Sequence, residues 1–495
     1  MIQDYSPKGV YYLEITCGEN PRAALDYLSH YRSPHLIGID ADYTVSRAYR
    51  SGGWPVFLVV DQNGMVRFHE FPDDKEFTRL RQCLDQLVGE TPAAPGAKPV
   101  VLEGMAWPPD IAACRDAKRD RSPRLAFDRA GSPCVVFYSN RDGTNAVYLR
   151  RLDRAGKTTD ERLSPPAEEC YAADCAVDPA GTLWVTWCGK EKGLFDIFVQ
   201  SRPAGQKPTT QQLSVSVEDA MSPRIAAGPD GTVTVTYYKW HTLWGTSRDR
   251  DVYARTFDPA GRTWRSEIEI SPHEPEVEDH TDPDVAVDGQ GGSWIVWSYD
   301  YHPSLFPKPL DAAQPTIFAA RSASNTVSPP FLVGATGQFR DAIDLFPSVA
   351  IDRQGVVWCA WDCSDPGRCI RLARFDEASR QFQAVRTFGG RGETCSTPEL
   401  APAGTNALLL CWSQRGREGL WQGKVVRLEA GQPVAEAMLT ESADVLFPQA
   451  QQSPDGQCWV AYEKSDAKGS EIVLRNITPA LQRAPAPAPI QTDDK

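Results

Sequence analysis

One short pattern recurs seven times along this chain and limits the folds that the chain can adopt. Its clearest copy runs from Ser222 to Tyr238 and predicts two strands joined by a tight turn at Gly231. Six copies hold a proline at the aligned position and the other holds Ala173. The prolines are Pro123, Pro223, Pro283, Pro347, Pro398 and Pro448, and the turn glycines are Gly131, Gly181, Gly231, Gly291, Gly355, Gly404 and Gly456. Self-similarity at such a period is typical of solenoids, propellers and arrays.

An aromatic residue lies six residues after the turn glycine in six of the copies. These aromatics are Phe137, Trp187, Tyr237, Trp297, Trp361 and Tyr462, with Trp412 slightly displaced in the sixth copy. The second strand of a copy is apolar on both faces, as in 356–361, which favours sheets stacked against neighbouring sheets. The pattern predicts a mostly β fold, a seven-bladed β-propeller whose copies span about 122–170, 171–219, 220–279, 280–344, 345–394, 395–445 and 446–478.

The last copy supplies only three strands before proline ends it. The stretch 98–103, ahead of the first copy, has the composition of the missing strand. We therefore expect 98–103 to complete the last blade, so that the propeller spans 98–478 and has no exposed edge at the closure.

Residues 1–90 follow a different pattern, in which strands and helices alternate. Strands are predicted at 10–15, 35–40, 56–61 and 65–71, and helices at 21–31, 43–50 and 74–88. This order predicts a small N-terminal α/β domain.

The segment from Tyr49 to Gly64 resembles thioredoxin-like domains of the TlpA/redoxin type, and the resemblance covers 8–88. It implies a cis-proline at Pro55, followed by a strand, a turn and another strand. Members of this family carry a Cys-x-x-Cys pair or a peroxidatic cysteine, which nothing here matches, so Cys17 is the only candidate thiol. Either the chain begins after the active-site helix, or the site has degenerated.

The copies around Ser139–Gly143 and Ser453–Gly456 resemble TolB-type propeller repeats, across roughly 122–478. This resemblance implies a fold and not an activity. Between the two domains, 91–97 reads as a linker, and the Pro/Ala-rich stretch 479–495 is expected to be a disordered tail.

Composition excludes some partners. The net charge of −13 argues against nucleic acid, which needs a basic face, and no apolar run is long enough to span a membrane. No signal peptide is visible at the N-terminus. We expect a periplasmic or secreted protein if the full-length gene encodes such a signal upstream.

The candidate ligand-binding residues lie on the face that carries the blade-joining loops and the connections from second to third strands. We expect the residue that follows each aligned proline to lie at the channel entrance. The ligand-binding candidates at this position are Arg124, Asp174, Arg224, Asp284 and Glu399, and Ser348 and Gln449 occupy it in the remaining copies. Aromatic and histidine candidates in the long connections of the third and fourth copies are Trp240, His241, Trp244, Tyr301 and His302. In the alternative interpretation, the aromatics cap blade ends and the charged ring is a self-neutralising ion-pair network.

The remaining chemistry is less specific. The acidic stretch from His273 to Asp284 has no recognised spacing of calcium or zinc ligands, so we predict a solvated loop, no metal site and no cofactor. Cys363 and Cys369 flank a turn and are a candidate disulfide in an oxidising compartment. Cysteines in second strands are expected to be buried apolar residues.

The sequence therefore predicts a propeller that recognises a glycan, peptide or protein ligand and is fused to a truncated or redox-inactive thioredoxin-like module. Two alternatives remain open: a thiol-disulfide oxidoreductase whose catalytic motif is missing from this chain, and a sialidase-like propeller hydrolase. The closest approach to an Asp-box turn, from Thr256 to Trp264, has one residue too many, and no residue is assigned as catalytic. A binding protein is expected rather than an enzyme.

Overall fold

The computed structural model describes 119–483 apart from short gaps, and before them only four strands and Leu84. The gaps are 153–157, 166–168, 192–193, 215–217, 244–246, 273–277, 302–315, 325, 335–343, 364–367, 390–392, 405, 416–418 and 467–468. The chain divides into two compact units, 1–109 with 301–312, and the remainder, which contains the described propeller strands.

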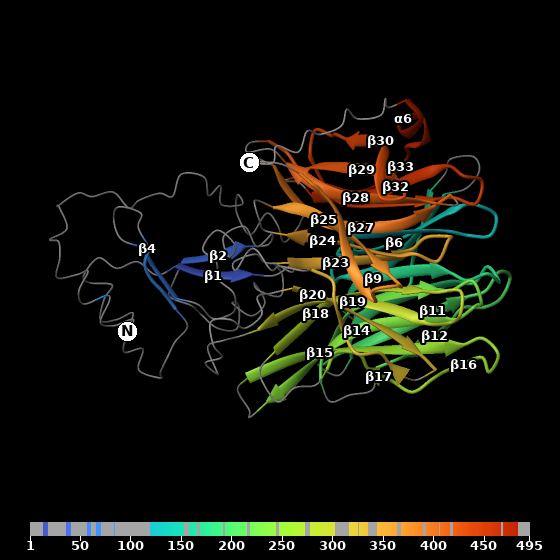
Figure 1. Cartoon of the computed structure of the whole chain (residues 1–495), viewed down its shortest axis with the longest axis horizontal. Helices are drawn as coiled ribbons and strands as arrows, with labels where there is room; N and C mark the ends of the chain where they lie inside the picture. The colour runs from blue at the N-terminus through green and yellow to red at the C-terminus, as the bar shows by residue number, and fades with distance from the viewer. Residues whose placement is uncertain are drawn as a thin grey trace. The chain divides into compact units, whose positions relative to one another are not determined.

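The second unit contains seven consecutive groups of antiparallel strands, the blades (Figure 1). Blade 1 contains β5 (Asp120–Phe127), β6 (Pro133–Ser139), β7 (Ala146–Leu152) and β8 (Thr158–Arg162). Blade 2 contains β9 (Cys170–Val177), β10 (Leu183–Glu191), β11 (Leu194–Arg202) and β12 (Thr209–Gln212). Blade 3 contains β13 (Ala220–Ala227), β14 (Val233–Leu243) and β15 (Ser247–Asp258), with the short outer pieces β16 (Thr263–Trp264) and β17 (Ile268–Glu269).

Blade 4 contains β18 (Glu278–Val287), β19 (Ser293–Tyr301) and β20 (Thr316–Ala323), with the outer pieces β21 (Thr326–Val327) and β22 (Phe331–Leu332). Blade 5 contains β23 (Asp344–Ile351), β24 (Val357–Cys363), β25 (Cys369–Asp376) and β26 (Gln381–Phe388). Blade 6 contains β27 (Thr394–Ala403), β28 (Ala407–Arg415), β29 (Gln422–Glu429) and β30 (Gln432–Leu439). Blade 7 contains β31 (Asp444–Gln452), β32 (Cys458–Asp466) and β33 (Gly469–Asn476). A single parallel bridge between Arg250 and Asp279 joins blades 3 and 4.

The blades close into a ring, which confirms the predicted seven-bladed propeller. Each first strand contacts the first strand of the next blade, in the order β5, β9, β13, β18, β23, β27, β31 and back to β5. Within the described residues a hydrophobic cluster fills each of the seven junctions between neighbouring blades, including the one between blades 7 and 1. Burial of apolar surface between sheets is therefore what holds the ring together.

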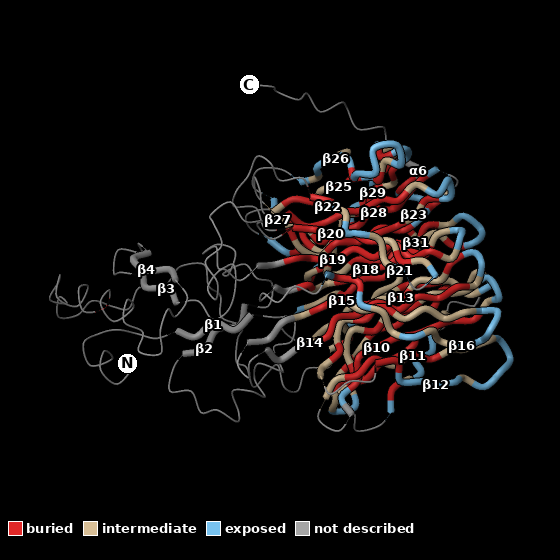
Figure 2. Tube along the Cα trace, turned by 60° about the horizontal axis from the view of Figure 1, so that its bottom comes forward, coloured by how far each residue is buried: buried red, intermediate tan, exposed pale blue. Residues whose placement is uncertain are grey.

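The repeated residues occupy the positions that the pattern predicts. All seven turn glycines have positive φ, which lets the chain turn between the first and second strands at little steric cost. The seven aromatics that follow them are buried. Figure 2 shows buried residues filling the strands of the propeller, with exposed residues concentrated at turns and outer strands.

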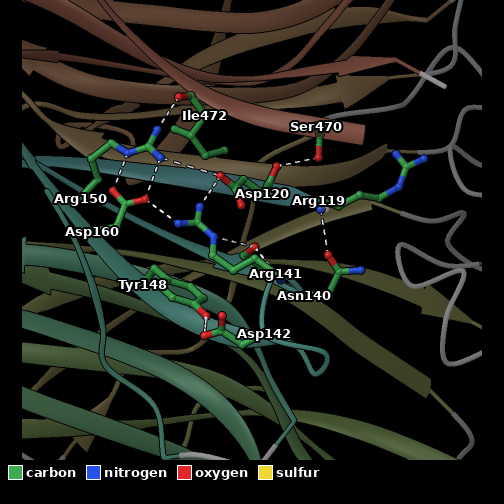
Figure 3. A network of polar contacts seen from close by, with 11 residues as sticks. Arg119, Asp120, Asn140, Arg141, Asp142, Tyr148, Arg150, Asp160, Ser470 and Ile472 are labelled. Carbon is green, nitrogen blue, oxygen red and sulfur yellow. Dashed lines mark hydrogen bonds and ion pairs between the residues drawn. The ribbon is translucent and has the colours of Figure 1, made fainter. Parts of the chain in front are cut away.

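Side-chain contacts join blade 7 to blade 1 (Figure 3). Arg150 Nη1 donates to the carbonyl oxygen of Ile472 at 2.6 Å, and Ser470 Oγ donates to that of Asp120 at 2.8 Å. Asp160 accepts from Arg150 Nε at 2.7 Å and holds this arginine in place. The predicted closing strand 98–103 lies outside the described residues, so its role stays a prediction.

The N-terminal unit is described by four strands. β1 (Leu13–Cys17) pairs in parallel with β2 (Leu36–Asp40), and β3 (Phe57–Val60) pairs antiparallel with β4 (Val66–Glu70). All four overlap the predicted strands. The thioredoxin-like fold stays a prediction, because the predicted cis-proline, the linker and most residues of the predicted helices lie outside the described part.

Two expectations differ from the structure. The first strand of blade 1 begins at Asp120, before the first copy was expected to start at about 122, because a bulge accommodates Pro123 within the strand. The start of the predicted disordered tail is ordered, since Thr478–Arg483 forms helix α6 and buries Leu481 in the cluster between blades 6 and 7. Among the helices described, none has the length and apolar character of a membrane span.

Candidate ligand-binding site

The first strand of every blade contains a residue in the left-handed backbone region, directly before the aligned proline position. These residues have φ of 48–53° and are Ser122, Ala172, Ser222, Asp282, Phe346, Thr397 and Phe447. In six blades the pairing register with the second strand shifts here, as expected of a β-bulge. The left-handed conformation costs a non-glycine residue about 1–2 kcal/mol. Because all seven blades adopt it at the same place, this part of the first strand is structurally constrained.

The residues predicted at the channel entrance, here called the ring residues, lie two positions after these bulges. Four of them, from four different blades, form ion pairs with one another. Glu399 of blade 6 pairs with Arg124 of blade 1 and, at 3.3 Å, with Arg224 of blade 3. Blades 3 and 6 are not neighbours, so the second of these ion pairs crosses the axis. Asp174 of blade 2 approaches Arg124 at 3.9 Å. The four side chains are 13–25% exposed, so solvent reaches each of them in part.

Ring residues also tie neighbouring blades together. Asp174 Oδ2 accepts from the backbone N–H of Ile225 at 3.0 Å, and Asp284 Oδ2 accepts from that of Val349 at 2.8 Å. Ser348 Oγ accepts from the N–H of Leu400 at 3.0 Å. In each case the donor directly follows the ring residue of the next blade. These contacts, with the Glu399 pairs, agree with the ion-pair network that the sequence left open, and they give the ring a structural role whether or not it binds a ligand.

The surroundings of two ring carboxyls raise their pKa values to about 7. Burial raises the pKa of Asp174 to about 7, although Arg124 opposes the shift. Burial, with the charge of Glu399, raises the pKa of Asp284 to about 7. Burial alone would lower the pKa of the Arg124 guanidinium, but Glu399 and Asp174 raise it above its ordinary value. The arginine therefore stays charged, while Asp174 and Asp284 can either donate or accept a proton.

These shifts predict that the protein loses stability as the pH rises from 6 to 8. Asp carboxyls of the unfolded chain titrate near 4, so between about pH 4 and 7 the native state holds protons that the unfolded state has released. Stability is therefore lost as the pH rises through 7, by about 1 kcal/mol for each such group. Denaturant unfolding at pH 6, 7 and 8 measures this. Glu463, whose pKa burial also raises to about 7, contributes in the same window.

Asp174→Asn should remove roughly a third of the pH dependence, because Asp174 is one of three groups that titrate near 7. Asp258→Asn is the matched control: its carboxyl accepts from turn N–H groups and its pKa lies below the ordinary value. Equal stability of the wild-type protein at pH 6 and pH 8 would contradict the assignment.

The aromatic candidates are only partly described. Trp240 and His241 were predicted in a loop but lie on β14, because its run of β-branched and aromatic residues extends the hairpin to Leu243. Arg250 lies over the Trp240 ring at 5.2 Å and covers one face of it. Trp244 and His302 lie outside the described residues, as do the side chains of His241 and Tyr301.

The remaining predictions at this face have mixed outcomes. His280, which the sequence placed in the acidic stretch, is buried and its Nδ1 accepts from Trp297 Nε1 at 2.8 Å. Among the described residues no cluster of histidine, cysteine or acidic side chains is arranged to hold a metal ion. Cys363 and Cys369 are directly opposite on β24 and β25, and no disulfide joins them in the structure. The disulfide stays a prediction.

Sequence analysis missed Glu463, a buried carboxyl on β32 that accepts from the N–H of Ser122 at 3.3 Å at the junction of blades 7 and 1. The other second strands hold different residues at this place, so the repeat itself does not reveal it.

No known family profile matches the chain, and no curated protein matches its sequence. Solved structures are similar in fold. A protein of unknown function from Dyadobacter fermentans is 14% identical, with a TM-score of 0.44 over 72% of this chain and 98% of its own. An ulvan lyase of polysaccharide lyase family 25 is 10% identical, with a TM-score of 0.46 over 74% and 98%. The sialidase of Trypanosoma rangeli is 9% identical, with a TM-score of 0.42 over 74% of this chain and 59% of its own. At this level of similarity these structures carry no argument about fold or activity, and the resemblance to TolB-type repeats stays a prediction.

Proposed function

We propose that this chain is a recognition module whose propeller binds a glycan at the loop-rich end of its central channel. The observation that carries the proposal is the ring itself. Arg124, Arg224, Asp174 and Glu399 come from four blades and meet at one level of the channel while retaining some solvent exposure. Convergent polar groups that solvent can reach are a usual feature of small-molecule sites.

The chemistry of the ring suits a ligand with many hydroxyl groups. Neighbouring hydroxyls of a sugar can donate to a carboxylate and accept from a guanidinium, both of which present two atoms in one plane. The near-neutral pKa of Asp174 and Asp284 adds groups that can act as donor or acceptor. The loop-rich ends of the strands form one face of the propeller. Trp240, near the end of β14, supplies an aromatic ring close to that face.

Arg224→Gln is expected to weaken glycan binding by at least tenfold, on the order of 1.4 kcal/mol, because a charged hydrogen bond to the ligand is lost. Arg224 is the most exposed arginine of the ring, so its loss should lower the melting temperature little. The full-length protein is first screened on glycan and peptide arrays, and the best ligand is then titrated calorimetrically against both proteins.

Arg427→Gln is the control, since Arg427 forms a surface pair with Glu429. If Arg224→Gln binds the glycan as tightly as the wild-type protein, the ring residues are not part of the binding site. Binding to peptides alone would keep a recognition module and replace the ligand class.

A second candidate is hydrolysis of a glycan at the same ring. It is favoured by one observation, the two carboxyls with pKa near 7, since glycoside hydrolysis uses a protonated and an ionised carboxyl together. Release of reducing ends from a bound glycan, lost in Asp284→Asn, would establish it. Binding without release would leave recognition as the function.

A further inference from the structure

Blade 5 carries an acid and two thiols in one row across three adjacent strands. Asp344 on β23 is directly opposite Cys363 on β24, and Cys363 is directly opposite Cys369 on β25. Residues opposite each other in antiparallel strands share one face of the sheet, with Cβ atoms about 4.5–5.5 Å apart. Asp344 and Cys363 are 0% exposed and Cys369 is 4% exposed. The three side chains therefore form one buried cluster.

A glycine makes room for this cluster. A Cβ on Gly334 would lie 2.8 Å from Asp344 Oδ2, so the carboxyl occupies the space that a side chain would fill. Cys395, the next cysteine along the chain, belongs to a different cluster: it packs between blades 5 and 6, whereas Cys363 and Cys369 pack between blades 4 and 5.

Gly334 departs from the repeat. At the corresponding place after the outer strand, blades 1, 2 and 3 hold Ser164, Ser214 and Ser271. Each serine Oγ accepts from the N–H of the third strand, at Val147, Ile197 and Val252 respectively. Gly334 of blade 4 has no side chain for that hydrogen bond, and Asp344 of blade 5 occupies the space instead. Loss of a repeated structural contact at this place indicates that the cluster has a role of its own.

The Asp344 carboxyl is poorly satisfied. Neither of its oxygens accepts a well-formed hydrogen bond from the described residues, although the Cys363 thiol and Trp361 indole lie close enough to lower its pKa. Burial outweighs both and raises the pKa of Asp344 to about 6. A buried, unsatisfied polar group costs stability and calls for an explanation beyond packing.

The two thiols differ in acidity. A hydrogen bond from Cys363 lowers the pKa of Cys369 below that of an ordinary thiol, against the opposing effect of burial. The Cys363 thiol faces both Cys369 and Asp344, and its single proton can be given to only one of them at a time. Thiolates are the nucleophiles of disulfide exchange, so Cys369 is the better placed thiol to react first.

We propose that Cys363 and Cys369 form a reversible thiol–disulfide site, with Asp344 as the positioned proton acceptor for Cys363. The oxidant is a low-molecular-weight disulfide. The Cys369 thiolate attacks one of its sulfurs, its S–S bond breaks, and one small thiol leaves. Cys363 then passes its proton to Asp344 and attacks the mixed disulfide, forming the Cys363–Cys369 bond and releasing the second small thiol. The two protein thiols lose two electrons and two protons, which the small disulfide takes up as it becomes two thiols.

The test uses the full-length protein equilibrated with mixtures of oxidised and reduced glutathione. Free thiols are then blocked, and the protein is digested with trypsin, which cleaves after Arg368 and separates Cys363 from Cys369. A disulfide-linked pair of peptides that contains these two cysteines is expected, and it should disappear on reduction. The other described cysteines should remain free. No such link at any glutathione ratio, or equal oxidation of Cys134 and Cys458, would overturn the proposal without need of any variant.

Variants then assign the roles. Cys363→Ser should abolish the link and leave a mixed disulfide on Cys369, whereas Cys458→Ser, a buried cysteine of blade 7, should leave the Cys363–Cys369 link unchanged. Asp344→Asn should slow closure of the mixed disulfide about tenfold and leave the mixed disulfide detectable on Cys369. If a folded Asp344→Asn protein converts the mixed disulfide to the Cys363–Cys369 disulfide at the wild-type rate, Asp344 is not the proton acceptor.

Discussion

Replacing Glu399 with glutamine is expected to lower the free energy of unfolding by about 3 kcal/mol at pH 7. Its carboxylate pairs with both Arg124 and Arg224 near the axis, so the substitution leaves two positive charges with little solvent around them. Removing one partner of a buried pair costs about 3–5 kcal/mol, and the residual exposure of these side chains places the expected value at the lower end. Chemical denaturation followed by tryptophan fluorescence measures the change.

The same substitution should also alter the titration of Asp284. The Glu399 charge is one of the causes that raise the pKa of Asp284, so removing it should lower that pKa and favour the ionised carboxylate. An ionised Asp284 would compensate part of the lost negative charge near Arg124. We therefore expect a smaller loss of stability between pH 6 and 8 in the variant than in the wild-type protein.

Glu429→Gln is the matched control, because Glu429 is 51% exposed and pairs with Arg427 at the surface. Surface pairs contribute about 0–1 kcal/mol, so this variant should unfold within about 0.5 kcal/mol of the wild-type protein. If both variants behave alike, solvent screens the axis and the charged ring does not hold the blades together.

The periodic part of this fold could be predicted from the sequence because each copy repeats local chemistry. A glycine with positive φ, an apolar second strand and a buried aromatic are properties of single residues and their near neighbours. Their spacing therefore located every blade.

Features that depend on the backbone could not be predicted in the same way. None of the seven left-handed residues is a glycine, so nothing in Ser122 or Phe447 signals a positive φ. Trp240 was expected in a loop because the spacing of the repeat ends there, whereas cross-strand pairing with Arg250 continues the hairpin.

Contacts between distant copies were also beyond the sequence. The pairing of Glu399 with arginines of blades 1 and 3 depends on the ring geometry rather than on any local pattern. The row from Asp344 to Cys369 requires the register of three strands, and the sequence pointed only to the two cysteines that flank a turn.

Trp297→Ala is expected to destabilise the protein by about 3–5 kcal/mol, the range for truncating a large aromatic in a packed core. Trp297 is fully buried in the cluster between blades 3 and 4 and stacks on Phe318 with ring centroids 6.1 Å apart. Its Nε1–H also donates to Nδ1 of the buried His280 at 2.8 Å, so truncation removes a hydrogen bond as well as packing. Equilibrium unfolding in guanidinium chloride gives the free energy.

Trp297→Phe separates the two contributions, because phenylalanine keeps most of the aromatic volume and cannot donate to His280. We expect a loss of about 1–2 kcal/mol for this variant, which reflects the missing hydrogen bond and a small cavity. Since the junctions between blades are filled by separate clusters, each variant should weaken one junction of the ring. Loss of less than 1 kcal/mol in Trp297→Ala would mean that the junction collapses around the cavity, and that the repeated aromatics are not what fixes the spacing of the blades.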